Sequence, residues 1–249
     1  MKKLIKIYGE RNTNTNFMSK LIKLNLLVRE IPGVVPSSIM TLQRILPGRE
    51  WVRDLYFALT YGRNLGWKHT RVKPASELKK YDILKQDISF LTITKNPYSW
   101  LLSLYRHSYH QYYRQKPDFE AFLRTLWKTV GRENCIGTLK TPMELWNIKN
   151  NSYLGLAEFN HLSITTESII QDPKTVIDRI GSEFSIDKSS VQFVNYEEST
   201  KDKSKDFAYY QDYYLKEKWR DNLTKEATSI INQSVDKNLM SYFGYEILA

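Results

Sequence analysis

The stretch Leu4 to Asn16, LIKIYGERNTNTN, joins an apolar run to a run of polar turn formers. Its first part, Leu4–Tyr8, predicts a short buried strand. Thr15 or Asn16 is suited to cap a helix, which we expect over about residues 17–28. A strand, a polar loop and a helix in this order are typical of the first unit of a nucleotide-binding α/β domain.

A second unit of the same kind begins at Ile88–Thr94, ISFLTIT, which is the strongest strand signal in the chain. Pro97 fits the first turn of the helix that follows, which continues through about Tyr105. His161–Thr165 predicts a third strand, and a helix over about Pro173–Phe184 follows it. Because strands alternate with helices, the sequence predicts a parallel sheet covered on both faces.

The other segments carry weaker patterns. They predict a loop-rich stretch at 31–50, a short strand at 65–69, helices over 119–130 and 139–149, an exposed charged loop at 197–206, and one or two helices over 223–243. We expect residues 1–249 to form a single domain, with 31–64 and 197–214 as insertions or lid segments.

Charge and composition narrow the class of protein. The 249 residues carry 37 Lys+Arg against 27 Asp+Glu, and residues 1–80 alone hold 16 against 5. A basic surface attracts nucleic acid, anionic membrane or small anions, or it is simply solvated. The single cysteine, Cys135, excludes an intramolecular disulfide and a cysteine-rich metal site. We find no apolar run of 18 residues and no secretory signal, so we expect a cytoplasmic protein.

The segment Gly9–Asn16, GERNTNTN, has the chemistry of an anion-binding loop. A turn before a helix presents backbone N–H groups and the positive end of the helix dipole, and Arg11 adds a charge. It is not a Walker A sequence, because Asn14 and Thr15 stand where that pattern requires Gly and Lys. Hydrolysis of a magnesium nucleotide is therefore poorly supported, and an ordinary capped loop is the alternative.

The segment Lys95–Ser103, KNPYSWLLS, places a cation at the end of the strongest strand and a hydroxyl eight residues later. Open α/β sheets bind ligands at that edge, so Lys95 and Ser103 are suited to hold one phosphate from two sides. The alternative is a lysine in solvent and a serine on a polar helix face.

Together the two segments resemble the sulfotransferases that use 3′-phosphoadenosine 5′-phosphosulfate (PAPS), above all bacterial members whose loop is similar to GERNSGTN. The resemblance extends over residues 5–245. It includes Trp67-Lys68-His69, Leu145-Trp146-Asn147, Thr165–Pro173 (TTESIIQDP) and Phe243-Gly244-Tyr245.

The resemblance implies a P-loop-NTPase-like three-layer fold, with a central parallel sheet flanked by helices. It implies PAPS as donor, adenosine 3′,5′-bisphosphate (PAP) as product, and no metal. His69 would be the general base, and Lys68 and Arg11 would stabilise charge. Lys95 and Ser103 would bind the 3′-phosphate. The residues that would bind the 5′-phosphosulfate are Gly9, Arg11, Asn12, Thr13, Asn14, Thr15 and Asn16.

Three positions depart from the family. Asn14 replaces a glycine, and asparagine is the side chain best able to keep a left-handed backbone. Lys95 replaces an arginine and binds phosphate as a point charge rather than as a fork. Thr166 replaces the tyrosine of an adenine contact. In place of the family's R-K-G loop the chain offers Lys201, Lys203 and Lys205, which either serve the 3′-phosphate or lie in a solvated charged loop.

The acceptor is less well determined. Residues 98–127 combine aromatic rings with cations, which suits an acidic sugar or a packed helix. The residues are Tyr98, Trp100, Tyr105, Arg106, Tyr109, Tyr112, Tyr113, Arg114, Arg124 and Trp127. The resemblance to bacterial sulfotransferases favours a carbohydrate or glycolipid, which is compatible with a peripheral membrane contact. Competing hypotheses are a P-loop phosphoryl transferase that uses ATP and magnesium, and a non-catalytic polyanion or nucleic-acid binder. We find no helix-turn-helix, zinc or RNA-binding signature that supports the nucleic-acid binder, and the sequence predicts no oligomeric state.

Overall fold

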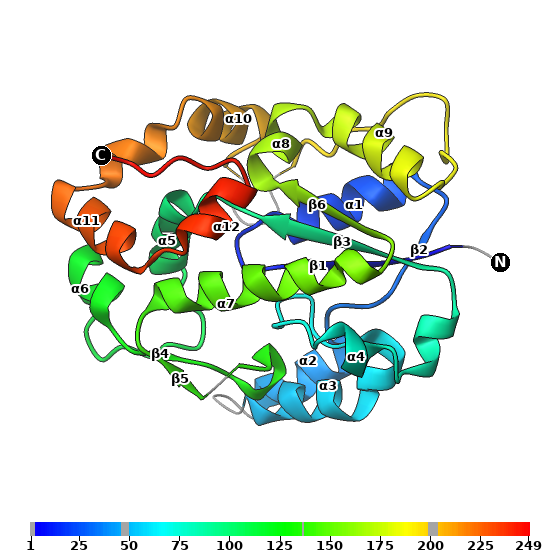
Figure 1. Cartoon of the computed structure of the whole chain (residues 1–249), viewed down its shortest axis with the longest axis horizontal. Helices are drawn as coiled ribbons and strands as arrows, with labels where there is room; N and C mark the ends of the chain where they lie inside the picture. Colours follow the sequence, from blue (N-terminus) through cyan, green and yellow to red (C-terminus); the bar gives the residue numbers. More distant parts are fainter. Residues whose placement is uncertain (1–2, 46–49, 136, 199–203) are drawn as a thin grey trace.

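The computed structural model describes residues 3–45, 50–135, 137–198 and 204–249. Its centre is a parallel sheet in the order β2-β1-β3-β6 (Figure 1). The strands are β1 (Leu4–Gly9), β2 (Arg29–Glu30), β3 (Ile88–Thr94) and β6 (His161–Thr165). β1 pairs with β3 from Leu4↔Ile88 to Gly9↔Ile93, so both strands end at the same edge. The three strands expected from their apolar runs are confirmed.

Helices cover both faces of this sheet. Alternate side chains of the strands point to opposite faces, and those on each face belong to a separate apolar core. On one face Ile5, Ile7, Leu91 and Ile93 pack with α1 (Thr15–Asn25), α8 (Thr166–Gln171) and α9 (Pro173–Glu183). On the other, Leu4, Tyr8 and Phe90 pack with the end of α7 (Pro142–Leu154) and with η3 (Gly155–Glu158). Every residue of β1 and β3 is buried, as in a sheet with two covered faces. The predicted three-layer α/β class is therefore confirmed.

A helical region extends from the carboxyl edge of the sheet and surrounds the largest apolar cluster, which contains Trp100, Trp127 and Trp146. Its elements are α5 (Pro97–Arg106), α6 (Phe119–Arg124), η4 (Lys218–Asn222), α11 (Lys225–Ser234) and α12 (Lys237–Tyr242). The remaining helix of this part, α10 (Phe207–Leu215), packs on α8.

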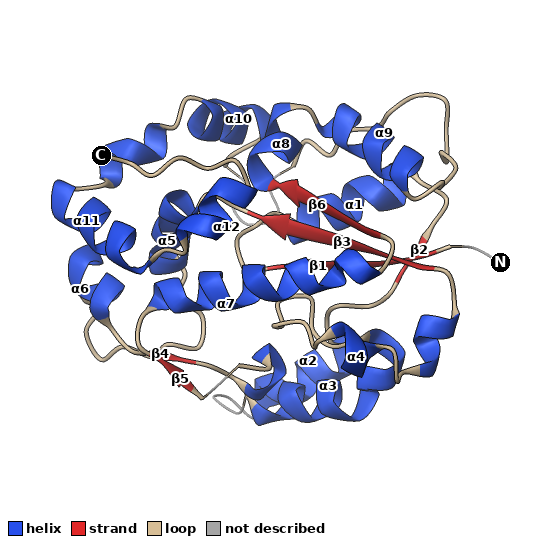
Figure 2. Cartoon of the chain, in the orientation of Figure 1, coloured by secondary structure: helices blue, strands red, loops and turns tan. Residues whose placement is uncertain are grey.

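The last group of elements lies beside the sheet at the bottom of Figure 1. It contains α2 (Ser37–Ile45), α3 (Trp51–Asn64), α4 (Ala75–Leu78) and η1 (Asp82–Lys85). The predicted loop at 31–50 is thus wrong in part, because α2 forms between its prolines. Figure 2 shows the short antiparallel pair β4 (Trp127–Lys128) and β5 (Thr138–Leu139) apart from the main sheet. η2 (Gly131–Glu133) lies between these two strands in the sequence.

The predicted strand at 65–69 is also wrong. Leu65 has φ +57° and Gly66 has φ +83°, which turn the chain where a strand would extend it. Side chains of β1 hold this turn. The Lys6 amine donates to the carbonyls of Asn64 (2.5 Å), Gly66 (2.7 Å) and Pro32 (3.2 Å). Burial lowers the pKa of Lys6 to about 7, yet three acceptors require three N–H groups, which only the ammonium form has.

Other boundaries differ by a few residues. The helix expected over 17–28 spans Thr15–Asn25, and that expected over 139–149 begins at Pro142 and continues to Leu154. The helix expected over 119–130 ends at Arg124, so that Trp127 belongs to a strand. Of the predicted loop at 197–206, residues 199–203 lie outside the described residues, and with them Lys201 and Lys203. Among the described residues, no helix combines the length and apolarity needed to cross a bilayer.

Candidate functional site

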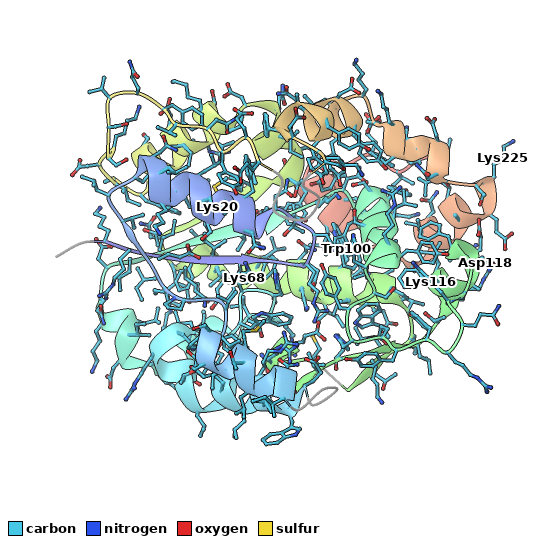
Figure 3. The ribbon with its side chains drawn as sticks, turned by 180° about the vertical axis from the view of Figure 1, so that it is seen from behind. Lys20, Lys68, Trp100, Lys116, Asp118 and Lys225 are labelled. Carbon is cyan, nitrogen blue, oxygen red and sulfur yellow. The ribbon has the colours of Figure 1, made fainter. Side chains whose placement is uncertain are left out.

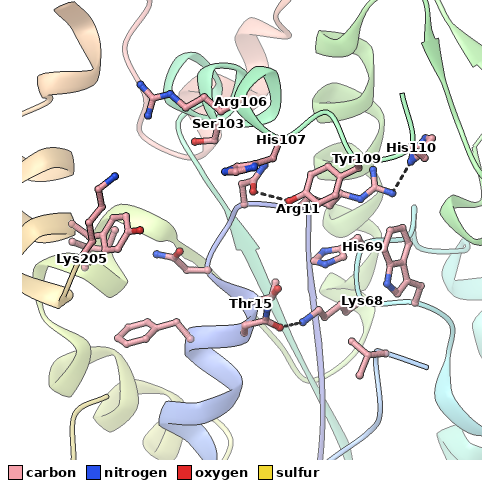
Figure 4. Close-up of a pocket in the computed structure, with 18 of the residues that line it drawn as sticks. Arg11, Thr15, Lys68, His69, Ser103, Arg106, His107, Tyr109, His110 and Lys205 are labelled. Carbon is pink, nitrogen blue, oxygen red and sulfur yellow. Dashed lines mark hydrogen bonds between the residues drawn. The ribbon is translucent and has the colours of Figure 1, made fainter. Parts of the chain in front are cut away.

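A cavity of about 940 Å³ opens at the carboxyl edge of the sheet, where β1 and β3 end (Figure 4). Of the eleven predicted site residues, eight line it: Arg11, Asn12, Asn14, Thr15, Asn16, Lys68, His69 and Ser103. Gly9, Thr13 and Lys95 are buried and are not among the lining residues. The structure thus brings the predicted residues together, and their individual roles stay predictions.

The loop after β1 has a shape that only certain residues permit. A Cβ at Gly9 would lie 2.7 Å from both the Ile93 carbonyl oxygen and Thr13 Oγ1, so this position requires glycine. Asn12 and Asn14 have φ values of +67° and +61°. The prediction that Asn14 keeps a left-handed backbone in place of glycine is therefore confirmed. α1 begins directly after it, and the first N–H groups of a helix have no acceptor within the helix.

Arg11 extends from this loop into the cavity wall. Its NH1 lies 3.1 Å from Glu133 Oε1, and its guanidinium lies over the rings of Trp67 (4.7 Å) and Tyr109 (4.6 Å). Its NH2 lies 3.3 Å from Nδ1 of His110. An arginine only donates, so the His110 nitrogen that faces it is the unprotonated one.

Arg11 also belongs to a buried charge network that the sequence did not reveal. Lys149 pairs with Glu133 at 3.0 Å and with Glu10, and all four side chains are at most 4% exposed. Burial alone would raise the pKa of Glu133, but Lys149 and Arg11 lower it to about 2. The network holds two acids and two bases, so it is neutral as a whole and fixes the arginine in place.

His69 lines the cavity, and a hydrogen bond from one of its ring nitrogens fixes the orientation of the ring. Its Nδ1 lies 2.5 Å from the Gly9 carbonyl oxygen, which only accepts, so Nδ1 carries the proton and Nε2 the lone pair. The ring also packs edge-on against Trp67 at 4.8 Å. Burial, and next the Lys68 cation, lower the pKa of His69 well below its usual range. The imidazole is therefore neutral at pH 7 and able to accept a proton.

Lys68 links the turn that carries His69 to the start of α1, because its amine donates to Asn16 Oδ1 (Figure 4). Burial lowers the pKa of Lys68. The side chain is 7% exposed and lines the cavity.

Lys95 and Ser103 meet as the spacing predicted, with 2.9 Å between Nζ and Oγ. Lys95 is only 1% exposed, because the Tyr214 hydroxyl of α10 accepts from the same amine at 2.8 Å. Burial raises the pKa of Tyr214, but the charge and the hydrogen bond of Lys95, together with Ser103 and Arg106, lower it overall. Tyr214 is a site residue that sequence reasoning missed, and it covers the pair in this structure.

The other stretches that carried the resemblance support the edge of the sheet. Trp146 Nε1 donates to the Lys95 carbonyl (3.0 Å), and Trp100, labelled in Figure 3, donates to that of Arg11 (2.9 Å). Glu167 accepts from the Asn96 backbone (3.0 Å) and from the Tyr245 hydroxyl (2.8 Å). These contacts fix the backbone around the two predicted phosphate sites. Thr166 is buried in α8 at 1% exposure.

The aromatic segment 98–127 divides between core and cavity. Tyr98, Trp100 and Trp127 are fully buried in the core. Arg106, Tyr109 and Tyr112 line the cavity, with His107 and His110 between them in the sequence. Lys205 also lines the cavity, on the opposite side from His69 in Figure 4. The described residues contain no group of three or more His, Cys, Asp or Glu that could hold a metal ion.

Comparison with known proteins gives likenesses in structure but not in sequence. No protein-family model matches the chain, and no curated protein matches it in sequence. The sulfotransferase domain from the curacin biosynthetic pathway matches 100% of this chain and 99% of its own, at 11% identity and a TM-score of 0.45. Because that TM-score is low, the assignment of the fold class rests on the strand order and the covered sheet described above.

Proposed function

We propose that this protein is a sulfotransferase, which transfers a sulfuryl group from PAPS to a hydroxyl or amine of a carbohydrate or glycolipid. One observation carries the proposal. A loop with a left-handed backbone at a helix start, two cations and a neutral imidazole converge on one cavity at the carboxyl edge of a parallel sheet. That combination supplies an anion site and a proton acceptor together.

The donor would lie across the two strand ends. Its phosphosulfate would accept hydrogen bonds from N–H groups of the loop before α1. Its 3′-phosphate would bind the Lys95 amine and the Ser103 hydroxyl. For this the phosphate displaces the Tyr214 hydroxyl, which already occupies that pair as a weaker acceptor. A dianionic phosphate attracts an ammonium far more strongly than a phenol does, so the exchange is favourable.

The transfer step follows from the position of His69. The acceptor oxygen forms a bond to sulfur while the bond between sulfur and the bridging phosphate oxygen breaks. The acceptor proton passes to Nε2 of His69, and the electron pair of the broken bond goes to the phosphate of PAP. Arg11 and Lys68 balance the charge that develops on the sulfuryl and phosphate oxygens.

Donor binding would also adjust the base. The cations Lys68 and Arg11 contribute to the low pKa of His69. A bound phosphosulfate neutralises those cations and raises that pKa toward neutrality, where a general base works best.

The experiment combines binding with transfer. PAP should bind without metal in calorimetry, and radiolabelled PAPS should transfer its sulfuryl group to a glycan or glycolipid panel. His69→Ala should keep PAP binding and lose at least 100-fold in rate. His161→Asn is the matched control, since that ring bonds Thr92 at 2.9 Å in the sheet. Binding of ATP with magnesium but not of PAP would refute the proposal, as would full activity of His69→Ala.

A further inference from the structure

A short part of the chain exposes an unusual number of large apolar side chains. Seven of them fall within residues 34–59, on α2, α3 and the turn before α2, and each is 40–77% exposed. They are Val34, Met40, Leu42, Ile45, Trp51, Leu55 and Leu59. The two helices contact each other, and large apolar side chains exposed close together mark a site of contact with another molecule. We call these seven residues the apolar surface.

On α3 the exposed side chains follow the helical period. Trp51, Leu55 and Leu59 are spaced by four residues and are 52%, 48% and 77% exposed. The helix buries Val52 and Phe57 on its inner side. A helix on the surface of a water-soluble domain presents polar residues outward, whereas α3 is apolar on both sides.

Basic residues accompany this surface. In the sequence, residues 34–80 hold nine Lys+Arg and three Asp+Glu; of the nine, Lys68 is buried in the cavity wall and Arg49 lies outside the described residues. Exposed members of this set include Arg63 at the end of α3, Arg71, and Lys80 next to η1, which contacts α3. Apolar helices that carry Trp and Leu and are fringed by cations bind in the plane of anionic membranes, where burial and charge add.

The apolar surface is also continuous with the cavity. Val34, Gln43, Glu50 and Arg53, from the same two helices and the adjoining turns, form part of the cavity wall. A lipid in a membrane that contacts α2 and α3 would therefore lie next to the part of the cavity wall that these helices form.

We propose that α2 and α3 dock on an anionic lipid surface, and that the acceptor enters the cavity from that surface as a glycolipid. The second clause rests on the proposed function, and the first does not. A second copy of the chain fits the surface less well. In a twofold dimer the same patch meets itself, so the cations of residues 34–80 would face one another.

The test is flotation of the full chain with vesicles in 0.1 M salt. The protein should bind vesicles of phosphatidylcholine with 30% phosphatidylglycerol and stay in solution with pure phosphatidylcholine. Leu55→Glu/Leu59→Glu should reduce the bound fraction at least tenfold. Leu126→Glu/Val191→Glu is the matched control, because those side chains are 66% and 100% exposed outside the apolar surface. It adds the same two charges and should leave binding within twofold of wild type.

Three outcomes would overturn the docking proposal. They are no binding of the wild type to anionic vesicles, equal losses in both double variants, and a dimer in light scattering that only Leu55→Glu/Leu59→Glu dissociates. PAP calorimetry on the same variants separates this proposal from the proposed function. If the protein binds vesicles but not PAP, the proposed sulfotransferase function is refuted and the docking proposal stands. If it binds PAP but not vesicles, the docking proposal is refuted and the proposed function stands.

Discussion

Substitution of Glu133 by glutamine tests the buried charge network around Arg11. Glu133 is 0% exposed, lies 3.1 Å from Arg11 NH1 and accepts from Lys149 at 3.0 Å and from the Val130 backbone at 3.0 Å. Glutamine keeps the volume and an acceptor oxygen but removes the charge. The network then holds two cations against Glu10 alone and carries an unbalanced buried charge of +1.

The expected loss follows from that imbalance. Breaking a buried ion pair by removing one partner costs about 3–5 kcal/mol. Because glutamine still accepts one hydrogen bond, we expect the lower end, about 3 kcal/mol of the free energy of unfolding. For a chain of this length the melting temperature should fall by about 6–12 °C. Since the pKa of Glu133 is about 2, Glu133 stays ionised from pH 5 to 8 and its own titration adds no pH dependence to the difference from wild type.

The assay is urea denaturation with and without PAP. Glu133→Gln should be stabilised more by PAP than wild type, because the anion compensates the excess positive charge on Arg11. Adding Lys149→Met restores neutrality and should recover at least half of the lost stability. A loss below 1 kcal/mol for Glu133→Gln, or a further loss in the double variant, would refute the reasoning.

Three further predictions concern single residues. An unfolded chain binds a proton at His69 below about pH 6.5 and the folded chain does not, so stability should fall as pH decreases from 6.5 to 5. The free energy of unfolding, measured by urea denaturation at these pH values, should depend less steeply on pH in His69→Gln than in wild type. An unchanged pH dependence would contradict the neutral, buried state of His69. Tyr214→Phe leaves Lys95 without its phenol partner, so PAP should bind about threefold more tightly in calorimetry; weaker binding would show that the phenol helps to hold the phosphate. Gly9→Ala should cost about 2 kcal/mol in thermal melts and abolish PAP binding, whereas Gly155→Ala, whose Cβ meets nothing within 4 Å, should do neither.

The sequence predicts those parts of the fold that depend on local pattern. Ile88–Thr94 forms a strand because its β-branched run is buried on both faces, and the polar loop before α1 follows from its own residues. The sequence predicts a short strand at 65–69, yet side chains of Lys6 and Tyr8, about 60 residues away, bind the carbonyls of Asn64, Leu65 and Gly66 and impose a turn. No local pattern contains that information.

The candidate site divides in the same way. Lys95 and Ser103 were predictable because Lys95 follows directly on a strand and Ser103 lies in the helix that begins two residues later, so the chain itself brings them together. Glu133, Lys149 and Tyr214 were not, because each reaches the site from an element more than 100 residues from its partner in the loop or strand. An acid or a tyrosine on a helix has the same sequence signature whether it faces solvent or a buried cation.

The left-handed asparagines of the loop have a consequence for how an anion binds. A glycine at position 14 would sample both signs of φ in the unfolded chain, whereas asparagine samples fewer conformations and loses less backbone entropy on folding. With Asn12 in the same region, and with Trp100 holding the Arg11 carbonyl, the loop is preorganised. If the loop binds an anion as proposed, the anion would meet N–H groups already in position, and its binding free energy would not be reduced by the cost of ordering the backbone.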